Sequence, residues 1–555
     1  MKADLLVLNA RIHTLDDQCT IVDSLAALNG RVLAVGPAEK LSPLAAPDTK
    51  VLDLGGRTVL PGFIDAHEHL SWFAEEPLKL NVSPAHVRSL SDLTRLVSQE
   101  AARLRPGEWV QGVLYDDTKI AEGRPLTRAD LDQAAPHHPV IIVHVSGHWA
   151  VVNSAALKAG RLNDQSPDPK GGTLGRDPVT SRLDGRLIEM AMFNFAFESL
   201  AVGPTVVPPF ARDVRRNAVK RAAGILNAAG VCGVGDALTA PSYVTTYHDL
   251  FASGELSLRV NMIIPYIFLQ HMEQLGLPGP WGNEWVRCAG IKVIIDGAIA
   301  GRTAALKNGY ANDAGNHGVL LIEDQNELNE IIGRIHRAGY QACVHANGDI
   351  AIEMALKAIE HAQKGCPREN TRHRIEHCTM IDDQLLAWMA RLGVLALPFG
   401  SYLWQHGEKL RPFYGKRADR MFAHGSFLRA GVKVAGSSDH PAGLYPPLLG
   451  VQSMVTRRTA AGEIIGVEEK IPLIEAFRMY TVYAAYASGE EKIKGRLVPG
   501  HLADMVVLER DPWDCPAEEI STIGVHQTIV GGRTVHGPRH DGAHLRAEKA
   551  HVGTT

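Results

Sequence analysis

Eight short apolar segments, each running into polar or ionisable residues, are spaced along the middle of the chain. Helical sequences separate several of them; residues 326–339 and 351–363 carry apolar side chains at spacings of three and four. This alternation predicts a parallel α/β fold, and eight strands suit a closed (β/α)₈ TIM barrel. The eight segments are 63–70, 230–238, 258–266, 291–297, 341–348, 374–378, 394–400 and 432–439.

The sequence outside this series predicts further parts. Residues 71–229 follow the first strand and are far too many for a loop, so we expect an insertion that forms a lid subdomain over the barrel mouth. Residues 1–60 and 495–537 alternate β-branched segments with glycine turns, which predicts one small β-sandwich built from both termini. The barrel then spans 61–494, and the polar residues 538–555 form a frayed tail rather than a metal site.

Composition excludes several classes of protein. Apolar residues make up 45% of the chain and charged residues 21%, which rules out wholesale disorder. A net charge of −4 argues against a nucleic-acid partner or a polybasic membrane anchor. No apolar run approaches the roughly 18 residues of a membrane span, and the first residues do not resemble a signal peptide. The seven cysteines are widely spaced without a CxxC, so we expect free thiols in a cytoplasmic protein.

Histidines and one aspartate stand at the carboxyl ends of the predicted strands. His67 and His69 alternate along the first strand, which puts both rings on one face. His345, His377 and Asp439 end three later strands. Because the carboxyl ends of all barrel strands meet at one face, we expect these side chains to converge there. Four imidazoles and one carboxylate suit Zn²⁺ or a similar divalent ion.

Motifs along nearly the whole chain resemble one family. The sequence is similar to the metal-dependent amidohydrolase superfamily, in the branch called amidohydrolase family 3, which includes N-substituted formamide deformylases. The motifs that carry the resemblance are PGFIDAHEHL (61–70), SGHWAVVNSAAL (146–157), IKVIIDG (291–297), VHANGD (344–349), HRIEHC (373–378), GSSDHP (436–441) and GRLVPGHLADMVVLERDP (495–512).

The resemblance implies a centre with two divalent metal ions. His67, His69 and Asp439 would hold the buried ion, and His345 and His377 the more exposed one. Zinc is the expected metal, and Mn, Fe, Co or Ni accept the same ligands.

Lys292 stands where a carboxylated lysine bridges the two ions in this superfamily. An ammonium group cannot bind a cation, whereas a carbamate (N6-carboxylysine) offers two oxygens that span ions about 3.5–4 Å apart. The alternatives are an ordinary ion pair between Lys292 and Asp296, a site with one tightly bound ion, and a thiolate bridge from Cys232.

The charges of such a centre predict the mechanism. Two ions that share a water lower its pKa toward neutrality and provide hydroxide, which attacks a carbonyl carbon. Asp439 accepts the proton and delivers it to the leaving nitrogen. Asp439 also suits a helix N-cap, and both roles can hold together.

Substrate contacts are predicted from less specific signals. His148 and Asn153 lie in the motif within the insertion, and the alternative for His148 is packing with Trp149 under the lid. Asp296 and Arg302 follow the lysine strand at the barrel mouth, where they could orient substrate or ligands. Three further acidic residues are expected to be structural or to support ligands: Glu68, Asp349 and Glu376.

These patterns predict a hydrolase of non-peptide carbon–nitrogen bonds in a small molecule. The favoured substrate is a linear amide, an N-substituted formamide or an N-acyl amine; a deaminase or a cyclic amidase is the alternative. A catalytically silent scaffold is less consistent with six competent ligand positions. We expect no nucleotide cofactor, because no glycine-rich string matches the dinucleotide fingerprint, and no serine nucleophile elbow. A homodimer is expected from base rates alone.

Overall fold

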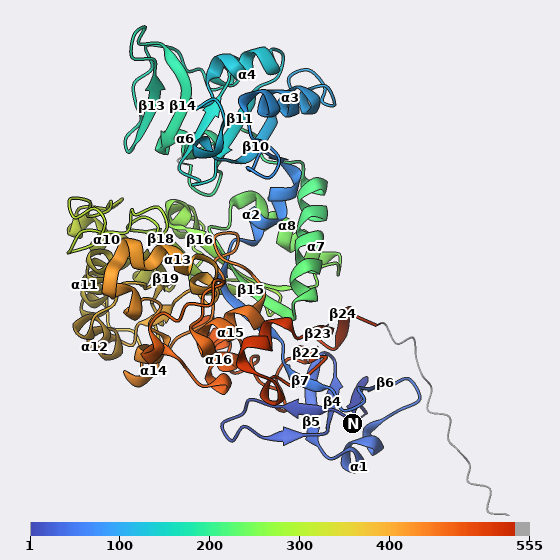
Figure 1. Ribbon diagram of the computed structural model, residues 1–555. Helices are drawn as coiled ribbons and strands as arrows, with labels where there is room; N and C mark the ends of the chain where they lie inside the picture. Colours follow the sequence, from blue (N-terminus) through green and yellow to red (C-terminus); the bar gives the residue numbers. More distant parts are fainter. Residues whose placement is uncertain (1, 202, 539–555) are drawn as a thin grey trace, which may run out of the picture.

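The computed structural model describes residues 2–201 and 203–538, and its centre is a barrel of parallel strands (Figure 1). Every strand of the run is parallel to its neighbour. The predicted mixed α/β fold with a parallel barrel is therefore confirmed. In spatial order the strands are β8 (Phe63–Glu68), β15 (Val231–Ala237), β16 (Arg259–Pro265), β18 (Val286–Ile294), β19 (Gln341–Ala346), β20 (Arg374–His377) and β21 (Leu395–Leu397).

The eighth predicted strand is present as a segment with isolated bridges rather than a regular strand. Val434 pairs in parallel with Ala396 of β21, and Ser437 pairs in parallel with Phe399 just after that strand. On its other side, the Ala66 N–H donates to the Gly436 carbonyl at 3.1 Å, and the Asp439 N–H donates to the His67 carbonyl at 2.8 Å. The segment therefore lies between β21 and β8, at the seam of the barrel.

Amphipathic helices cover the outside of the barrel. In α10 (Gln325–Arg337), for example, the Asp324 side chain caps the first turn, and the buried residues Leu328, Ile331 and Ile335 form one stripe. That stripe belongs to the main apolar core. The other longer helices of this layer are α7 (Arg212–Ala228), α8 (Pro241–Ala252), α11 (Asp349–Gly365), α12 (Asp383–Leu392), α13 (Tyr402–Tyr414) and α15 (Pro447–Thr456).

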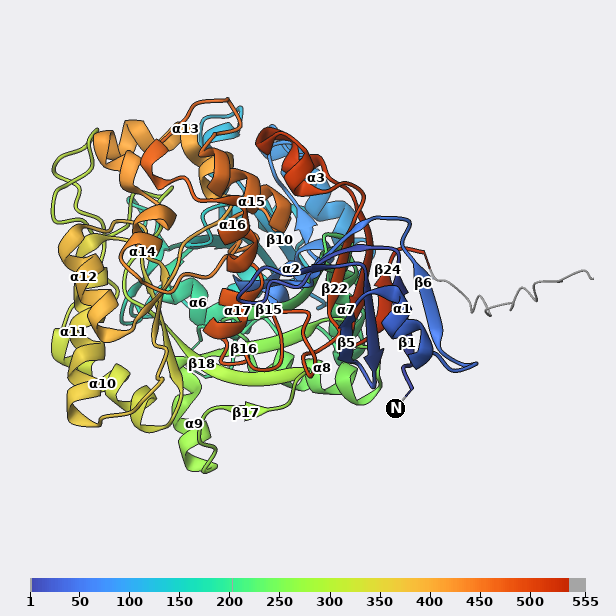
Figure 2. The same ribbon diagram turned by 90° about the horizontal axis from the view of Figure 1, so that it is seen from below.

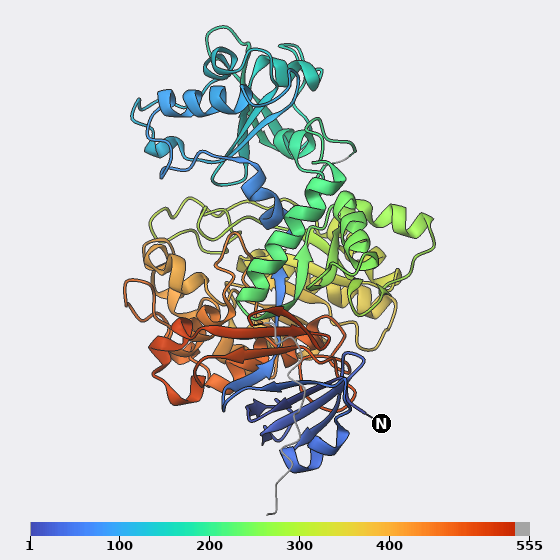
Figure 3. The same ribbon diagram turned by 90° about the vertical axis from the view of Figure 1, so that its right-hand side faces the viewer.

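The chain between β8 and β15 contains a second, six-stranded sheet that stands apart from the barrel (Figures 1 and 3). Helix α2 (Leu70–Glu75) leads from the barrel toward this sheet, and α7 leads from the sheet back to the barrel. The sheet has its own buried apolar clusters on both faces. Its strands, in spatial order, are β13 (Gly172–Arg176), β14 (Leu183–Glu189), β12 (Trp149–Val152), β11 (Val140–His144), β10 (Val110–Tyr115) and β9 (Leu80–Asn81), and its helices are α3 (Leu90–Ala101), α4 (Arg128–Ala134), α5 (Ser154–Ala159) and α6 (Met190–Ala196).

Two sheets from the chain ends lie beside one another at the side of the barrel opposite the insertion (Figures 2 and 3). They share a buried apolar cluster that includes Val7, Val59 and Ile529. One sheet contains β5 (Arg31–Gly36), β4 (Ser24–Leu28), β1 (Leu5–Leu8) and β6 (Lys50–Asp53). The other contains β24 (Arg533–His536), β23 (Val525–Val530), β22 (Met505–Leu508), β7 (Thr58–Pro61), β2 (Arg11–His13) and β3 (Ile21–Val22).

Other expectations concern the cysteines, membrane spans and the tail. All seven cysteines lie within the described residues, and each is a free thiol. Among the described residues, no helix has the length and apolarity needed to cross a membrane. Apart from residue 538, the predicted tail lies outside the described residues.

Candidate metal centre

Three side chains converge at the seam of the barrel. Asp439 Oδ1 lies 3.2 Å from His67 Nε2 and 3.0 Å from His69 Nε2. Potential ligand atoms of the three residues all lie within 4.8 Å of one another, and each residue is buried. β8 is buried along its whole length, so its alternation directs His67 into the barrel interior.

Hydrogen bonds fix which nitrogen of each ring is free. Glu376 Oε2 accepts from His67 Nδ1 at 2.6 Å, and the carbonyl of Ala237 accepts from His69 Nδ1 at 2.8 Å. In the neutral form of each ring, which carries one proton, this leaves a lone pair on Nε2. These lone pairs and the Asp439 carboxylate face one another, which is the arrangement that a shared cation satisfies.

The remaining predicted ligands border this group. The His345 and His377 rings lie 4.5 Å apart by their centroids, and the His377 ring lies 5.1 Å from that of His67. Lys292 Nζ lies 3.1 Å from His67 Nε2. His377 Nδ1 lies 4.0 Å from the second carboxylate oxygen of Asp439. All six predicted ligands thus gather at one face of the barrel.

Unpartnered atoms give a test of whether these residues fit a metal. Asp439 Oδ1 and His377 Nδ1 are buried, and within the described part of the chain neither has a hydrogen-bond partner. Leaving such groups unsatisfied costs roughly 1–3 kcal/mol each. Nitrogen and carboxylate donors without protein partners suit a divalent ion of the zinc type, so the residues fit the metal that the sequence predicts.

Backbone strain accompanies the ligands. His377 has a φ of 68°, the following Cys378 44°, and Asp439 55°, all in the left-handed region that residues other than glycine rarely adopt. In β20, strand alternation puts Arg374 and Glu376 on the same face, and the left-handed turn at His377 interrupts that alternation. Strain of this kind persists where the surrounding structure demands it, often at functional sites.

Burial and charge shift the pKa values in the centre. Burial lowers the pKa of Lys292 despite the nearby Glu376 and Asp439 carboxylates. Burial acts to raise the pKa of Glu376, but Arg374 and His67 hold it well below its usual range. The Asp439 pKa is also held well below its usual range, since His377, His67 and His69 outweigh its burial. The floor of the site therefore contains two carboxylates with lowered pKa values beside an amine whose pKa is also lowered.

Aromatic rings pack against two of the ligands. Trp72 stacks on His69 at 4.3 Å between centroids, and Phe399 stacks on His377 at 4.5 Å. These contacts fix the planes of the rings, in addition to the hydrogen bonds that fix their tautomers.

Of the four predicted substrate residues, Asp296 lies closest to the ligands. Its Oδ1 lies 3.5 Å from His345 Nε2, and its carboxylate accepts from the backbone N–H groups of Ala305, Asn347 and Gly348. Burial raises its pKa to about 7 in spite of these donors. No ion pair joins Asp296 to Lys292 among the described residues, so the ordinary ion pair considered for Lys292 is absent there.

The other three predicted substrate residues lie apart from the ligands. Arg302 is on the loop after β18, 3.8 Å from Asp313. His148 pairs with Glu189 at 3.1 Å in the insertion. Asn153 is fully buried at the N-cap of α5, where its amide binds four backbone groups. Its contacts within the insertion leave its side chain no free donor or acceptor for a substrate.

Three remaining residues from the sequence analysis have clear positions. The thiol of Cys232 contacts the carbonyls of Gly230 and Ile529, at the opposite end of β15 from the ligands, so a thiolate bridge does not form. Both carboxylate oxygens of Glu68 are buried without a hydrogen-bond partner among the described residues, and burial raises its pKa well above the usual value. Asp349 accepts from the Lys307 N–H at the start of α11.

Sequence reasoning did not assign specific contacts to Arg374, Glu376, Trp72 or Phe399. Strand alternation in RIEH was a usable signal, because it places Arg374 on the same face as Glu376. The two stacking rings gave no such signal, since they are ordinary apolar residues in the sequence.

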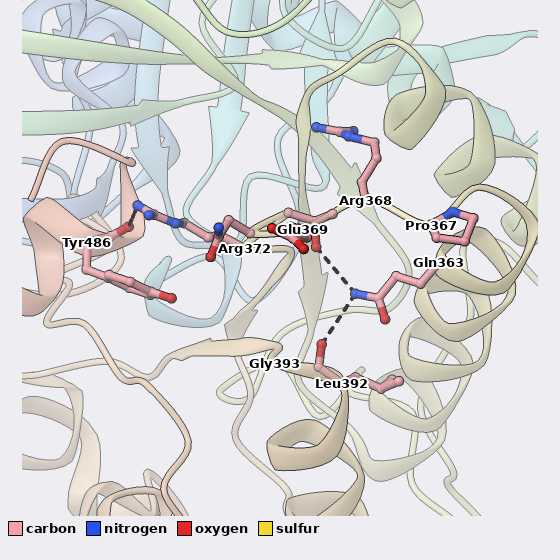
Figure 4. Close-up of a pocket in the computed structure, with 10 residues that line it drawn as sticks. Gln363, Pro367, Arg368, Glu369, Arg372, Leu392, Gly393 and Tyr486 are labelled. Carbon is pink, nitrogen blue, oxygen red and sulfur yellow. Dashed lines mark hydrogen bonds between the residues drawn. The ribbon is translucent and has the colours of Figure 1, made fainter.

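A surface hollow of about 560 Å³ lies elsewhere, at the amino-terminal side of the barrel (Figure 4). Its two arginines and its glutamine already have partners in the protein, whereas the exposed Glu369 carboxylate has none among the described residues. Arg372 binds the Glu491 carboxylate and the Tyr486 carbonyl, and the Gln363 amide donates to the Leu392 carbonyl. Among the described residues, the hollow therefore has no converging group of ligand atoms like that of the metal centre.

Comparison with known proteins assigns this barrel and its cluster to a class. A model of the amidohydrolase family matches residues 50–536, and the chain belongs to that family. The chain is 30% identical over 546 residues to the N-substituted formamide deformylase of Arthrobacter pascens, which covers 95% of this chain and 97% of that protein. The protein is thus a hydrolase that acts on carbon–nitrogen bonds.

Two further similarities extend over most of the molecule. The chain is 28% identical to a putative amidohydrolase, YtcJ, of Bacillus subtilis, over 95% of this chain and 98% of that protein. The crystal structure of an uncharacterized metal-dependent hydrolase from Pyrococcus horikoshii superposes with a TM-score of 0.76 at 22% identity, covering 92% of this chain and 99% of that one. At that identity the likeness concerns the fold alone.

Proposed function

We propose that the protein hydrolyses a linear amide, an N-substituted formamide or an N-acyl amine, at a centre that holds two divalent metal ions. One observation carries the proposal: the Nε2 atoms of His67 and His69 converge on the Asp439 carboxylate in a buried site. The similarity to a formamide deformylase over nearly the whole chain supports the choice of substrate class.

In this proposal the ligands divide into two sets. His67, His69 and Asp439 would hold one ion, and His345 and His377 would hold the other. When bound, ions of zinc, or of Mn, Fe, Co or Ni, would supply Lewis-acid polarisation of the substrate carbonyl and a water of lowered pKa. The second carboxylate oxygen of Asp439 points toward His377 and lies outside the contact with the first two histidines.

Asp439 performs the proton transfers of the reaction. Its Oδ1 faces the two histidines, which leaves the second oxygen to accept a proton from the attacking water. The same oxygen then donates that proton to the nitrogen of the leaving amine.

If carboxylated to N6-carboxylysine, Lys292 would supply two carbamate oxygens as ligands for the metal ions. Its amine is buried beside His67 without an ion-pair partner among the described residues, and burial lowers its pKa. A neutral amine is the form that reacts with carbon dioxide, and the resulting carbamate would carry the charge that two cations need nearby.

For His148, Asp296 and Arg302 we propose roles on the substrate side of the metal centre. Asp296 orients the His345 ring and the backbone of the neighbouring loops. Arg302 and His148 contact substrate from the loop after β18 and from the insertion, respectively. For Asn153 we propose only a structural role, because its amide is fully used by backbone groups.

A deaminase or a cyclic amidase is the second candidate. Short stretches of the chain match a methylthioadenosine/S-adenosylhomocysteine deaminase of Syntrophobacter fumaroxidans (47% identity over 70 residues) and an imidazolonepropionase of Symbiobacterium thermophilum (49% over 49 residues). These matches cover 12% and 8% of the chain, so they favour the alternative less than the full-length similarity favours a linear amide.

The domain organisation is part of the same proposal. Residues 61–494 would form the catalytic barrel, with 71–229 as an insertion that serves as a lid, and 1–60 with 495–537 a β-sandwich. We propose that the protein acts in the cytoplasm on a small molecule, and as a homodimer.

Elemental analysis of the untagged protein, combined with a substrate panel, tests this proposal. We expect about two metal equivalents per chain and metal-dependent hydrolysis of formamides or N-acyl amines. One equivalent, with activity on aminated heterocycles or cyclic amides, would favour the second candidate. Absence of metal from folded protein supplied with excess metal would contradict the enzyme mechanism and support a silent scaffold.

A further inference from the structure

A buried ion pair lies directly beneath His67. Glu376 Oε2 accepts from His67 Nδ1 at 2.6 Å, and Glu376 Oε1 accepts from Arg374 Nε at 2.6 Å. Glu376 is fully buried and Arg374 is 1% exposed. A carboxylate in such a place is costly unless it is paired and hydrogen-bonded, and here both of its oxygens are used.

Arg374 also links two strands that are not neighbours. It lies on β20, and its Nη2 donates to the Ala66 carbonyl of β8 at 3.2 Å. Between β20 and β8 lie β21 and the segment that carries Asp439. The guanidinium therefore spans the interior of the barrel and holds Glu376 against the strand that bears His67.

His67 on β8 and His69, which follows this strand at the N-cap of α2, differ in their hydrogen-bond acceptors. His69 donates to a neutral carbonyl, that of Ala237, whereas His67 donates to a charged carboxylate. Hydrogen bonds to ionised acceptors are shorter and roughly twice as strong as those between neutral groups. An acceptor of this strength fixes the tautomer and increases the electron density at the opposite nitrogen of the ring.

We propose that Arg374 and Glu376 form a positioning pair that sets the metal affinity of the centre by fixing His67 as an Nε2 ligand. The inference rests on the proposed role of His67 as a ligand. Neither residue touches substrate; Glu376 acts through His67, and Arg374 acts by orienting Glu376 and balancing its charge.

Glu376→Gln tests the pair with little change in volume. The amide cannot accept from both Arg374 and His67, so either the arginine loses its partner or His67 meets a donor and its tautomer changes. We expect the Zn²⁺ dissociation constant, measured on metal-free protein by competition with a chromogenic chelator, to rise roughly 10–100-fold. The d–d absorption of the Co²⁺ form should shift, which a purely structural role would not produce.

Glu469→Gln is the matched control. Glu469 is also a buried carboxylate, which accepts from the Ser426 backbone and hydroxyl far from the ligands. Its replacement removes a comparable network, and we expect the dissociation constant to change less than about threefold. Equal changes in the Zn²⁺ dissociation constant in Glu376→Gln and Glu469→Gln would overturn the proposal, because the loss of a buried charge would then explain both changes.

Arg374→Lys gives a second, gentler variant in case Glu376→Gln does not fold. Lysine retains the charge but cannot bind Glu376 and the Ala66 carbonyl in the same planar geometry. We expect a rise of roughly 3–10-fold in the dissociation constant, and a value within twofold of wild type in both variants overturns the proposal. If the wild-type protein itself binds no Zn²⁺, the proposed function fails, and that outcome is distinct from a failure of the positioning pair.

Discussion

The barrel has a histidine cluster at each end, and the two clusters use their nitrogens differently. At the amino-terminal end, His336 Nδ1 accepts from His373 Nε2 at 2.9 Å, and the His336 Nε2–H donates to the Cys366 carbonyl. His373 Nδ1 in turn accepts from the Ala342 N–H. Every ring nitrogen of this pair therefore has a protein partner.

The carboxyl-terminal cluster keeps a surplus of lone pairs. His67 and His69 each donate a hydrogen bond from Nδ1 to a protein acceptor, and the Nε2 atom of each ring faces Asp439. Buried histidine by itself therefore says little about metal binding. What distinguishes this ligand group is that ring nitrogens from different segments converge on one buried carboxylate.

The largest expected effect comes from removing ligands at the carboxyl-terminal end. The double variant His67→Ala, His69→Ala should lose its metal and at least about a thousandfold in rate, since an ion contributes several kcal/mol to transition-state stabilisation. Elemental analysis and rates on the best amide substrate measure both losses. Full activity in a folded double variant would contradict the metal assignment.

A smaller loss should follow from Lys292→Ala. If a carbamate bridges the ions, short carboxylic acids such as acetate or propionate supply replacement oxygens and restore part of the lost rate. The measurement is a titration of rate against added carboxylic acid, with the ligand variant His67→Ala as a control that the acids do not rescue. Normal metal content and a normal rate in Lys292→Ala would exclude the bridge.

The amino-terminal cluster should affect stability rather than catalysis. Burial, with His336 and Arg368 nearby, lowers the pKa of His373 to about 3. Below a pH of about 6.5 the unfolded chain binds a proton at His373, whereas the native protein does so only below about pH 3. The free energy of unfolding therefore falls as the pH decreases from about 6.5 to about 3, by at most about 1.4 kcal/mol per pH unit for this group. Above that window the contribution is constant.

His373→Phe tests both parts of this statement. The variant leaves the His336 Nδ1 and the Ala342 N–H unpaired. Its free energy of unfolding at pH 7.5 should therefore be about 1–3 kcal/mol lower than that of the wild-type protein. The difference in free energy of unfolding between the variant and the wild type should become smaller toward pH 4. The reason is that phenylalanine has no group that binds a proton in the unfolded chain, so only the wild type loses stability through residue 373. Denaturant titrations at several pH values measure it, and reduced metal content in the variant would show that the two clusters are coupled.

Much of the barrel could be predicted because buried parallel strands are short, apolar and end in polar residues. The predicted strand 63–70 corresponds to β8 and 231–237 lies within the predicted 230–238. The prediction for 291–297 began too late, since β18 starts at Val286, where Trp285 and Arg287 interrupt the apolar run. The segment 432–439 has apolar strand character but only isolated bridges, because it bends to present Asp439.

The candidate site was predictable in its donors and much less in its supports. Strand ends supplied His67, His345 and Asp439, since topology alone brings such positions together. The substrate residues depended on where the insertion lies, which no local pattern encodes. The link from Arg374 to the Ala66 carbonyl joins positions 308 residues apart, so only the closed barrel reveals it.

The seam of the barrel has a consequence for biosynthesis. A ribosome makes the His67–His69 pair early and reaches Asp439 only 372 residues later. The donor set is complete only after the last strand docks beside the first, so an ion that binds all three residues fastens the two ends of the sheet together. Completion of the donor set and closure of the barrel would then coincide, because both require the last segment to dock beside the first strand.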